Sequence, residues 1–245
     1  MAIRDTELLA VLKPWAQRHP RYGYRRVWAL LRRQGIRVNH KRLYRLWREH
    51  RFNVRTRRRR KQGGPPLLRL PKASRPNEIW AYDFVHDRCA NGEALKCLVV
   101  VDEYSRMCLA IEVGGRVDAR QVIAVLKGLI HADGMPRYIR SDNGPEFVAK
   151  AIQSWLATSG IGTAYIEPGK PWQNGAAESF IGKFRDECLN VEWFLSRREA
   201  RVIIEQYRRQ YNEERPHSSL DYRTPAEVEA MGAPNKSEGL TLPVV

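Results

Sequence analysis

Two acidic residues limit the folds available to this chain more strongly than any other feature of its sequence. Asp142 directly follows a short predicted strand, residues 138–141, and precedes the turn-forming pair Asn143-Gly144. Glu178 comes 36 positions later, near the start of a helical stretch. A carboxylate at a strand end and one on a helix can meet in space, and such a pair is typical of a site for hard divalent cations, which prefer oxygen ligands. We therefore expect a fold that brings this strand end and this helix together.

The charge of the chain is unevenly distributed. The chain has 245 residues, a net charge of +16 and a pI near 10.1. Residues 1–75 contain 23 lysines and arginines against three acids, whereas residues 76–245 have a net charge of −4. A strongly basic front part is typical of contact with nucleic acid or with an anionic membrane surface. No apolar stretch approaches the roughly 20 residues needed to cross a bilayer, and the N-terminus has no signal-peptide pattern.

The pattern of cysteines indicates the cellular compartment in which the protein folds. The four cysteines, Cys89, Cys97, Cys108 and Cys188, form no CxxC pair. We interpret them as reduced intracellular thiols that form neither a disulfide nor a zinc site. We therefore expect a cytoplasmic protein that has no membrane segment. Its basic front part further predicts that it associates with the nucleoid.

Residues 1–55 are predicted to form a small basic helical domain. Apolar spacing predicts helices over residues 5–18, 25–34 and 40–50, and Asn39 is a candidate N-cap of the third. Two helices joined by a turn that contains Gly35 are typical of a helix-turn-helix. The third helix has basic side chains that we expect to contact DNA phosphates or base edges: Lys41, Arg42, Arg45 and Arg48. The alternative is a solvated basic face on a helical bundle, which we favour less because so few acids balance it.

Residues 56–75 are predicted to form a basic, glycine- and proline-containing linker. Its charge run consists of Arg57, Arg58, Arg59, Arg60 and Lys61. Such a run can follow a phosphate backbone and release its counterions. A tether that only keeps the chain in solution is an equally good interpretation for any single arginine.

From residue 76 to residue 230 the pattern changes to that of an α/β domain, and residues 231–245 are expected to be a frayed tail. Strands are predicted over residues 79–85, 95–102, 107–113, 138–141 and 162–166. Helices are predicted over residues 119–131, 147–159 and 196–212 and around Glu178. Hairpin spacing of the first three strands predicts an antiparallel meander. Asp83 lies within the first strand, where an acid is unusual because a buried carboxylate needs a partner.

The order of these elements and the positions of the acids resemble the ribonuclease H-like fold of integrases and DDE transposases. Asp83, Asp142 and Glu178 match the catalytic triad of that superfamily, and the 35 residues between the last two are the spacing of one large branch. The sequences SDNGPEF around Asp142 and QNGAAESFIGKFRDE around Glu178 agree with this match. The N-terminal RYGYRRVWALLRRQGIRVNHKRLYRLWRE and the C-terminal YNEERPHSSLDYRTPAE resemble the second-frame product of bacterial insertion sequences of the IS-three family.

This resemblance implies a mixed sheet of five strands flanked by helices and preceded by a small all-α domain. It also implies a transposase that cuts the 3′ ends of a DNA element and joins them to target DNA. The three acids would hold two Mg²⁺ ions, which Mn²⁺ could replace, and the ions would serve the attacking and the leaving oxygen. Asn143 and Gly144 would shape the turn beside the metals, and Arg185, two helical turns beyond Glu178, would reach DNA phosphate.

The resemblance further implies double-stranded DNA as the partner, namely the element's terminal inverted repeats and the target. A first-frame transposase protein is expected as a fusion or a partner, and the active species is expected to be a homo-oligomer on DNA. Two alternatives use the same sequence features: a structure-selective nuclease without strand transfer, and a helix-turn-helix regulator whose second domain no longer cleaves. Other acids near strand ends compete with the triad. We expect the most prominent of them, Asp102, to have a structural or solvent-facing role.

Overall fold

The computed structural model of the chain describes residues 4–53, 73–141, 150–165 and 175–232. The chain divides into two compact units. We call residues 1–67 with residues 215–224 the helical unit, and residues 68–214 with residues 225–245 the sheet unit. The part of the chain that the structure describes contains no helix long and apolar enough to span a bilayer.

Three helices form the helical unit around one apolar core. They are α1 (Asp5–Arg18), α2 (Tyr24–Arg33) and α3 (His40–Glu49). Fully buried side chains from all three helices meet in this core: Leu8, Leu12, Val27, Leu31, Leu43 and Trp47. The predicted N-cap of α3 is confirmed, because the Asn39 side chain accepts a hydrogen bond from the Lys41 N–H at 2.9 Å. Gly35 follows α2 with a φ of +79°, a conformation that favours glycine.

Residues 215–224 group with the helical unit, although in sequence they lie between two helices of the sheet unit. The Arg33 guanidinium donates to the Tyr222 carbonyl oxygen at 3.0 Å, and the Tyr222 ring meets Trp28 edge-on. The sequence alone placed this segment in the second domain. The domain boundaries at residues 55, 75 and 230 remain predictions.

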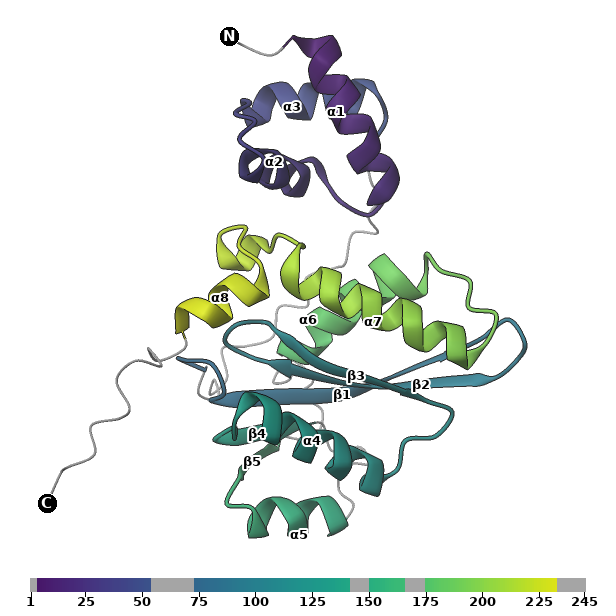
Figure 1. The fold of residues 1–245 in the computed structure, drawn as a ribbon, viewed down its shortest axis with the longest axis vertical. Helices are drawn as coiled ribbons and strands as arrows, with labels where there is room; N and C mark the ends of the chain where they lie inside the picture. Colours follow the sequence, from purple (N-terminus) through teal and green to yellow (C-terminus); the bar gives the residue numbers. More distant parts are fainter. Residues whose placement is uncertain (1–3, 54–72, 142–149, 166–174, 233–245) are drawn as a thin grey trace, which may run out of the picture. The chain divides into compact units, whose positions relative to one another are not determined.

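The sheet unit contains a five-stranded mixed sheet with the order β3-β2-β1-β4-β5 (Figure 1). The strands are β1 (Ile79–Arg88), β2 (Ala94–Asp102), β3 (Cys108–Gly114), β4 (Tyr138–Ser141) and β5 (Gly162–Tyr165). The first three form the predicted antiparallel meander, whereas β4 and β5 run parallel to β1. The predicted five-stranded mixed sheet is therefore confirmed. β1 is three residues longer than predicted, because residues 86–88 continue the ladder with β2.

Helices cover both faces of this sheet. α4 (Ala119–Asp133) and α5 (Lys150–Thr158) lie on one face, and α6 (Gly175–Phe184) and α7 (Arg197–Glu213) lie on the other (Figure 1). α6 continues into a π-helical turn, Arg185–Leu189, and α8 (Pro225–Gly232) comes last. The sheet is thus the middle of three layers, as the predicted fold class requires.

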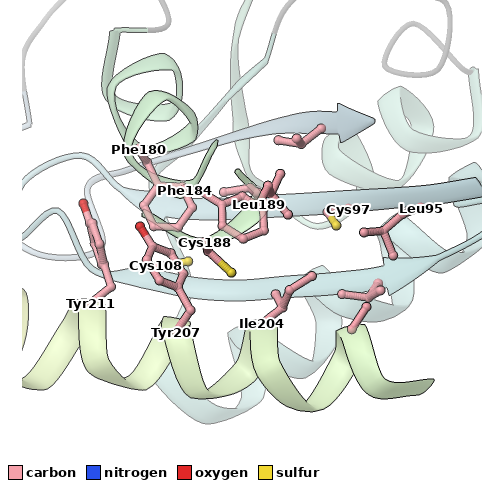
Figure 2. Close-up of a cluster of buried hydrophobic side chains, with 14 of the residues drawn as sticks. Leu95, Cys97, Cys108, Phe180, Phe184, Cys188, Leu189, Ile204, Tyr207 and Tyr211 are labelled. Atoms are coloured by element: carbon pink, nitrogen blue, oxygen red, sulfur yellow. The ribbon is translucent and has the colours of Figure 1, made fainter. Parts of the chain in front are cut away.

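Each face of the sheet has its own apolar core. On the α4 and α5 side the core includes Trp80, Tyr82, Leu98, Val100, Leu126 and Ile139. On the α6 and α7 side it includes Val85, Cys97, Val99, Phe180, Phe184 and Tyr211. Cys97, Phe180, Phe184 and Tyr211 are labelled in Figure 2. All four cysteines are free and buried, and burial raises the pKa of the Cys97 and Cys188 thiols to about 12. These two thiols therefore remain protonated and serve as core packing.

Candidate active site

Asp83 lies on the face of β1 that α6 covers. Successive side chains of a strand point to opposite faces, so Ala81, Asp83 and Val85 share one side of the sheet. Ala81 is buried in a small cluster with Ala177 of α6, and Val85 belongs to the larger core that contains other residues of α6. Asp83 is half-buried between these two contacts, and its carboxylate accepts a hydrogen bond from the next backbone N–H at 2.7 Å.

Glu178 lies in the first turn of α6, at the same junction of helix and strand. The two residues before it, Ala176 and Ala177, are buried against β1, while Glu178 itself is exposed. Small side chains at this contact let the helix backbone approach the strand closely. Because Glu178 follows Ala177 directly and Asp83 is two residues beyond Ala81, the contact brings the elements of both acids together.

The third predicted acid cannot be placed in the same way. β4 runs parallel to β1 beside Ala81 and ends at Ser141. Asp142 is the next residue in the sequence, but it lies outside the described residues, as do Asn143 and Gly144. The same holds for the charge run of residues 57–61, that is Arg57, Arg58, Arg59, Arg60 and Lys61. The complete triad therefore remains a prediction.

The side chains at the junction fit a hard cation. Asp83 and Glu178 supply carboxylate oxygens, the ligand type that Mg²⁺ prefers. Within the described ranges no group of three or more His, Cys, Asp or Glu side chains is placed to hold a metal ion. That survey includes Asp83 and Glu178 but not Asp142, so it covers only two of the three predicted ligands.

Two other acids near strand ends have structural partners. Asp102 at the end of β2 is fully buried and accepts hydrogen bonds from the N–H of Asn77 and of Tyr104, at 3.0 and 3.1 Å, and from the N–H and hydroxyl of Ser105, at 2.7 and 2.8 Å. Burial raises the pKa of the Asp102 carboxyl. Of the two expected roles, structural or solvent-facing, these contacts support the structural one, because Asp102 closes the turn after β2 and has no exposed surface.

Glu103 is the second such acid. Both of its carboxylate oxygens accept hydrogen bonds from Arg140 Nη1 on β4, at 2.7 and 3.0 Å. Both side chains are more than nine-tenths buried, with exposed fractions of 7% for Arg140 and 8% for Glu103. The pair therefore connects Arg140 of β4 to Glu103, the residue that follows β2. Arg140 comes two residues before Asp142 in the sequence.

Arg185, the predicted phosphate contact, is exposed at the start of the π-helical turn. Its guanidinium donates to the His86 carbonyl oxygen of β1 at 3.4 Å. A π-helical turn is rare and frequently occurs at functional sites. DNA contact by Arg185 nevertheless remains a prediction.

In the helical unit, the exposed face of α3 differs from the predicted one at one position. Lys41, Arg45 and Arg48 are exposed, as expected for DNA contacts. Arg42 is only partly exposed and forms an ion pair with Asp5 of α1, at 2.5 Å from Nη2 to Oδ1. Arg45 Nη2 lies 2.6 Å from the other carboxylate oxygen of Asp5. Hydrogen bonds from Arg42 and Arg45 hold the pKa of the Asp5 carboxyl below its usual range.

Tyr44 is the residue on this face that sequence reasoning missed. It is 40% exposed and lies between Lys41 and Arg48 on the exposed side of α3. The spacing of residues 41, 44, 45 and 48 is the i, i+3, i+4, i+7 pattern of one helix face. That pattern could have identified Tyr44, but the prediction considered only charged side chains.

Comparison with known proteins agrees with this architecture. Residues 2–60 match the family model described as HTH-like domain, and residues 73–171 and 159–225 match two models described as Integrase core domain. A 31.7 kDa protein of insertion element IS407 from Burkholderia multivorans is 44% identical over 231 residues, which cover 92% of this chain and 82% of that protein. The chain belongs to the integrase-core transposases of insertion elements.

Other members of this transposase family differ in length. A 39.2 kDa protein of insertion element IS476 from Xanthomonas euvesicatoria is 45% identical over 91% of this chain, but the match spans 64% of that protein, less than two thirds. Transposase InsD for insertion element IS2D from Escherichia coli K12 is 29% identical over 91% of this chain and 78% of its own length.

A solved structure confirms the fold. A chain of the simian T-cell lymphotropic virus intasome, solved in complex with PP2A regulatory subunit B56 gamma, superposes with a TM-score of 0.55. The superposition covers 89% of this chain and 74% of that chain, at 18% sequence identity. The predicted integrase-like arrangement of sheet and helices is therefore confirmed.

Proposed function

We propose that this transposase is the catalytic subunit that cuts the 3′ ends of a DNA element and joins them to target DNA. The observation that supports the proposal is the helix–strand junction: Ala177, the residue before Glu178 on α6, is buried with Ala81 on the face of β1 that bears Asp83. β4 ends at Ser141 beside β1, and the sequence continues with Asp142. These three acids form the proposed DDE triad.

The proposed ligands of two Mg²⁺ ions are Asp83, Asp142 and Glu178, with Mn²⁺ as a possible substitute. Bound ions of this kind activate an attacking oxygen and stabilise the leaving oxygen of a phosphoryl transfer. In this proposal Asp83, Asp142 and Glu178 would each supply carboxylate oxygens to the ions. No protein side chain then has to act as a general base.

The chain's own contribution is to hold these carboxylates in place before DNA arrives. β2 pairs with β1 at Asp83 itself, opposite Val99, and β4 pairs with β1 just before it, at residues 79–81, so the ladder holds the backbone that leads to Asp83. α6 is anchored by Phe180, whose ring meets Tyr211 of α7 edge-on at 4.7 Å, and by Phe184 in the same core (Figure 2). Rigid secondary structure of this kind is what a site with exact ligand spacing needs.

The proposed reaction has two phosphoryl transfers of the same type. In the first, the oxygen of a water molecule bonds to phosphorus at the element's end, and the bond from that phosphorus to the element's 3′ oxygen breaks. In the second, the new 3′-hydroxyl bonds to a phosphorus of the target, and a target 3′ oxygen leaves. Neither step forms a covalent bond to the protein.

The proposed partner is double-stranded DNA, both the terminal inverted repeats and the target. The helical unit, the charge run of residues 57–61 and Arg185 would contact its phosphates. A first-frame transposase protein is proposed as a fusion or partner, and the working assembly is proposed to be a homo-oligomer on DNA.

The test uses the purified full chain with a labelled duplex that carries the element's terminal repeat, in Mg²⁺ or in EDTA, and a denaturing gel. The proposal predicts metal-dependent nicks together with longer, joined strands. Nicks without joined strands would support the nuclease alternative. Binding without any product, also when the first-frame protein is fused to the chain, would support the regulator alternative and overturn the proposal.

A further inference from the structure

We infer that Tyr44 of α3 is a sequence-reading DNA contact, and that Lys41 and Arg48 beside it bind the flanking phosphates. This inference rests on the proposed DNA binding and deepens it by naming the side chain that distinguishes one DNA sequence from another. It also takes Arg42 out of the set of direct contacts, because its guanidinium is engaged by Asp5.

The position of Tyr44 on its helix carries the first part of the argument. α3 is the second helix of the helix-turn-helix, the one that enters the major groove in such motifs. One side of α3 is buried in the core through Leu43, Leu46 and Trp47. Tyr44 lies outside this buried stripe, and at 40% exposure it is the large aromatic side chain that α3 presents to solvent.

The Tyr44 ring is held in place before any ligand binds. The Tyr24 ring of α2 packs against the Tyr44 ring with ring centroids 4.7 Å apart. Arg48 comes one helical turn after Tyr44, and its guanidinium lies 5.9 Å from the centroid of the Tyr44 ring. Tyr24 is itself fixed by Arg25, whose Nε donates to the Tyr24 hydroxyl at 3.1 Å. A rigid, exposed aromatic ring loses little conformational entropy on binding, which makes it an effective recognition group.

The cations around Tyr44 differ in their availability. Arg42 and Arg45 both contact Asp5, and Arg45 also lies 3.5 Å from Glu49. Lys41 and Arg48, in contrast, have no ion-pair partner among the side chains that the structure describes. These two are therefore the cations of α3 that are free to neutralise phosphates.

An open groove lies next to the ring. It has a volume of about 470 Å³ and is lined by Tyr44, Arg45, Arg48 and Glu49. A base edge can enter such a groove and contact the ring, as apolar side chains contact the thymine methyl group in the major groove. Residues 4–53 carry 14 basic and three acidic residues, and all three acids are already paired with arginines. The charge therefore favours DNA as the occupant.

The test measures binding of the full chain to two duplexes, the terminal repeat and a scrambled sequence, in EDTA and at several salt concentrations. Tyr44→Ala should reduce the ratio of the two affinities by roughly tenfold, the loss of one base contact. The slope of affinity against salt should stay the same, because tyrosine carries no charge. Tyr44→Leu keeps apolar contacts with Tyr24 and with a thymine methyl group, so in a folded protein it should retain part of the discrimination that Tyr44→Ala loses.

The charged variants provide matched controls. Arg48→Gln should lower the salt slope by about one on both duplexes, whereas Arg42→Gln, with the same change in charge, should leave the slope unaltered. Trp193→Ala removes an aromatic side chain that is 78% exposed in the sheet unit, and it should change neither quantity.

The outcomes separate this inference from the proposed function. Unchanged discrimination in folded Tyr44→Ala, or equal slopes for Arg48→Gln and Arg42→Gln, would overturn the inference. A wild-type chain that binds both duplexes equally would also overturn it. A wild-type chain that binds no duplex would instead contradict the proposed DNA binding, since EDTA removes any dependence on catalysis.

Discussion

Ala81 of β1 and Ala177 of α6 are buried in one small cluster, and neither side chain has any exposed surface. Two methyl groups therefore set the distance between the strand that carries Asp83 and the helix that carries Glu178. The large aromatic residues of α6, Phe180 and Phe184, lie further along the helix in the neighbouring core. The proposed metal site is thus next to the buried alanine contact between helix and strand.

Replacing Ala177 with leucine should move α6 away from β1. Three additional carbon atoms in a filled contact cost about 1–3 kcal/mol of unfolding free energy, and a displacement of about 1 Å at a reacting centre can reduce a rate by roughly a hundredfold. We expect Ala177→Leu to lower strand joining far more than DNA binding. Ala157→Leu, at an exposed position of α5, is the matched control and should change neither. Normal joining by a destabilised Ala177→Leu protein would contradict this role.

The ion pair between Arg140 and Glu103 gives a prediction for stability. Removing one partner of a buried pair leaves the other charge without compensation, which typically costs about 3–5 kcal/mol. We expect Glu103→Gln to lower the unfolding free energy by this amount in urea titrations. The double variant Glu103→Gln/Arg140→Met should recover much of the loss, and a double variant as unstable as the single one would show that the pair itself is not the cause.

Substituting Asp102 should show that this acid stabilises the fold and takes no part in catalysis. Asp102→Ala leaves three backbone N–H donors without their acceptor, those of Asn77, Tyr104 and Ser105, and we expect a loss of about 2–5 kcal/mol. At a temperature where the variant is folded, its metal-dependent joining should match wild type. Calorimetry and the joining assay test the two halves of this prediction, and a stable but inactive variant would move Asp102 into the active site.

The carboxyl of Glu205 on α7 gives a prediction for pH. Hydrogen bonds from Arg208, and then from Arg209, lower its pKa from 4.5 to about 2. A lowered pKa stabilises the folded state above pH 4.5, and the contribution is lost as the pH falls from there towards 2. Because 41% of the Glu205 side chain is exposed, solvent screening limits the contribution to about 1 kcal/mol.

Glu205→Gln should therefore be less stable than wild type by about 1 kcal/mol at pH 7, and the difference should shrink steadily below pH 4. Urea unfolding of both proteins at pH 7, 4 and 3 measures this difference, and the comparison cancels the opposing effect of raised pKa values elsewhere. A gap that stays constant down to pH 3 would assign the loss to packing of the side chain rather than to its charge.

Local sequence patterns predicted the elements of this fold well. The observed bounds of α1 and β4 match those expected from apolar spacing and punctuation, and the Asn39 cap lies where its residue type indicated. These features depend on residues that are close in sequence. The mixed sheet followed from the order of strands and helices together with the family resemblance.

Contacts between distant residues could not be predicted in this way. Arg42 was expected to face DNA, but its partner Asp5 is 37 residues away, so nothing near Arg42 indicates that it is engaged. The same distance in sequence separates Arg140 from Glu103. The alanine contact between β1 and α6 could not be predicted either, because alanines contribute little to the apolar spacing of a sequence. The contact supports the pairing of Asp83 with Glu178 that the sequence motifs predicted.

Strand joining by single-carboxylate variants tests the central claim most directly. The full chain, with the first-frame protein fused where the assay requires it, is incubated with terminal-repeat duplex and Mg²⁺, and joined strands are quantified. We expect no joined strands from Asp83→Asn, Asp142→Asn or Glu178→Gln, with DNA binding intact, and wild-type joining from Asp87→Asn at an exposed position of the same strand. Joining at the wild-type rate by any of the three variants would remove that acid from the site.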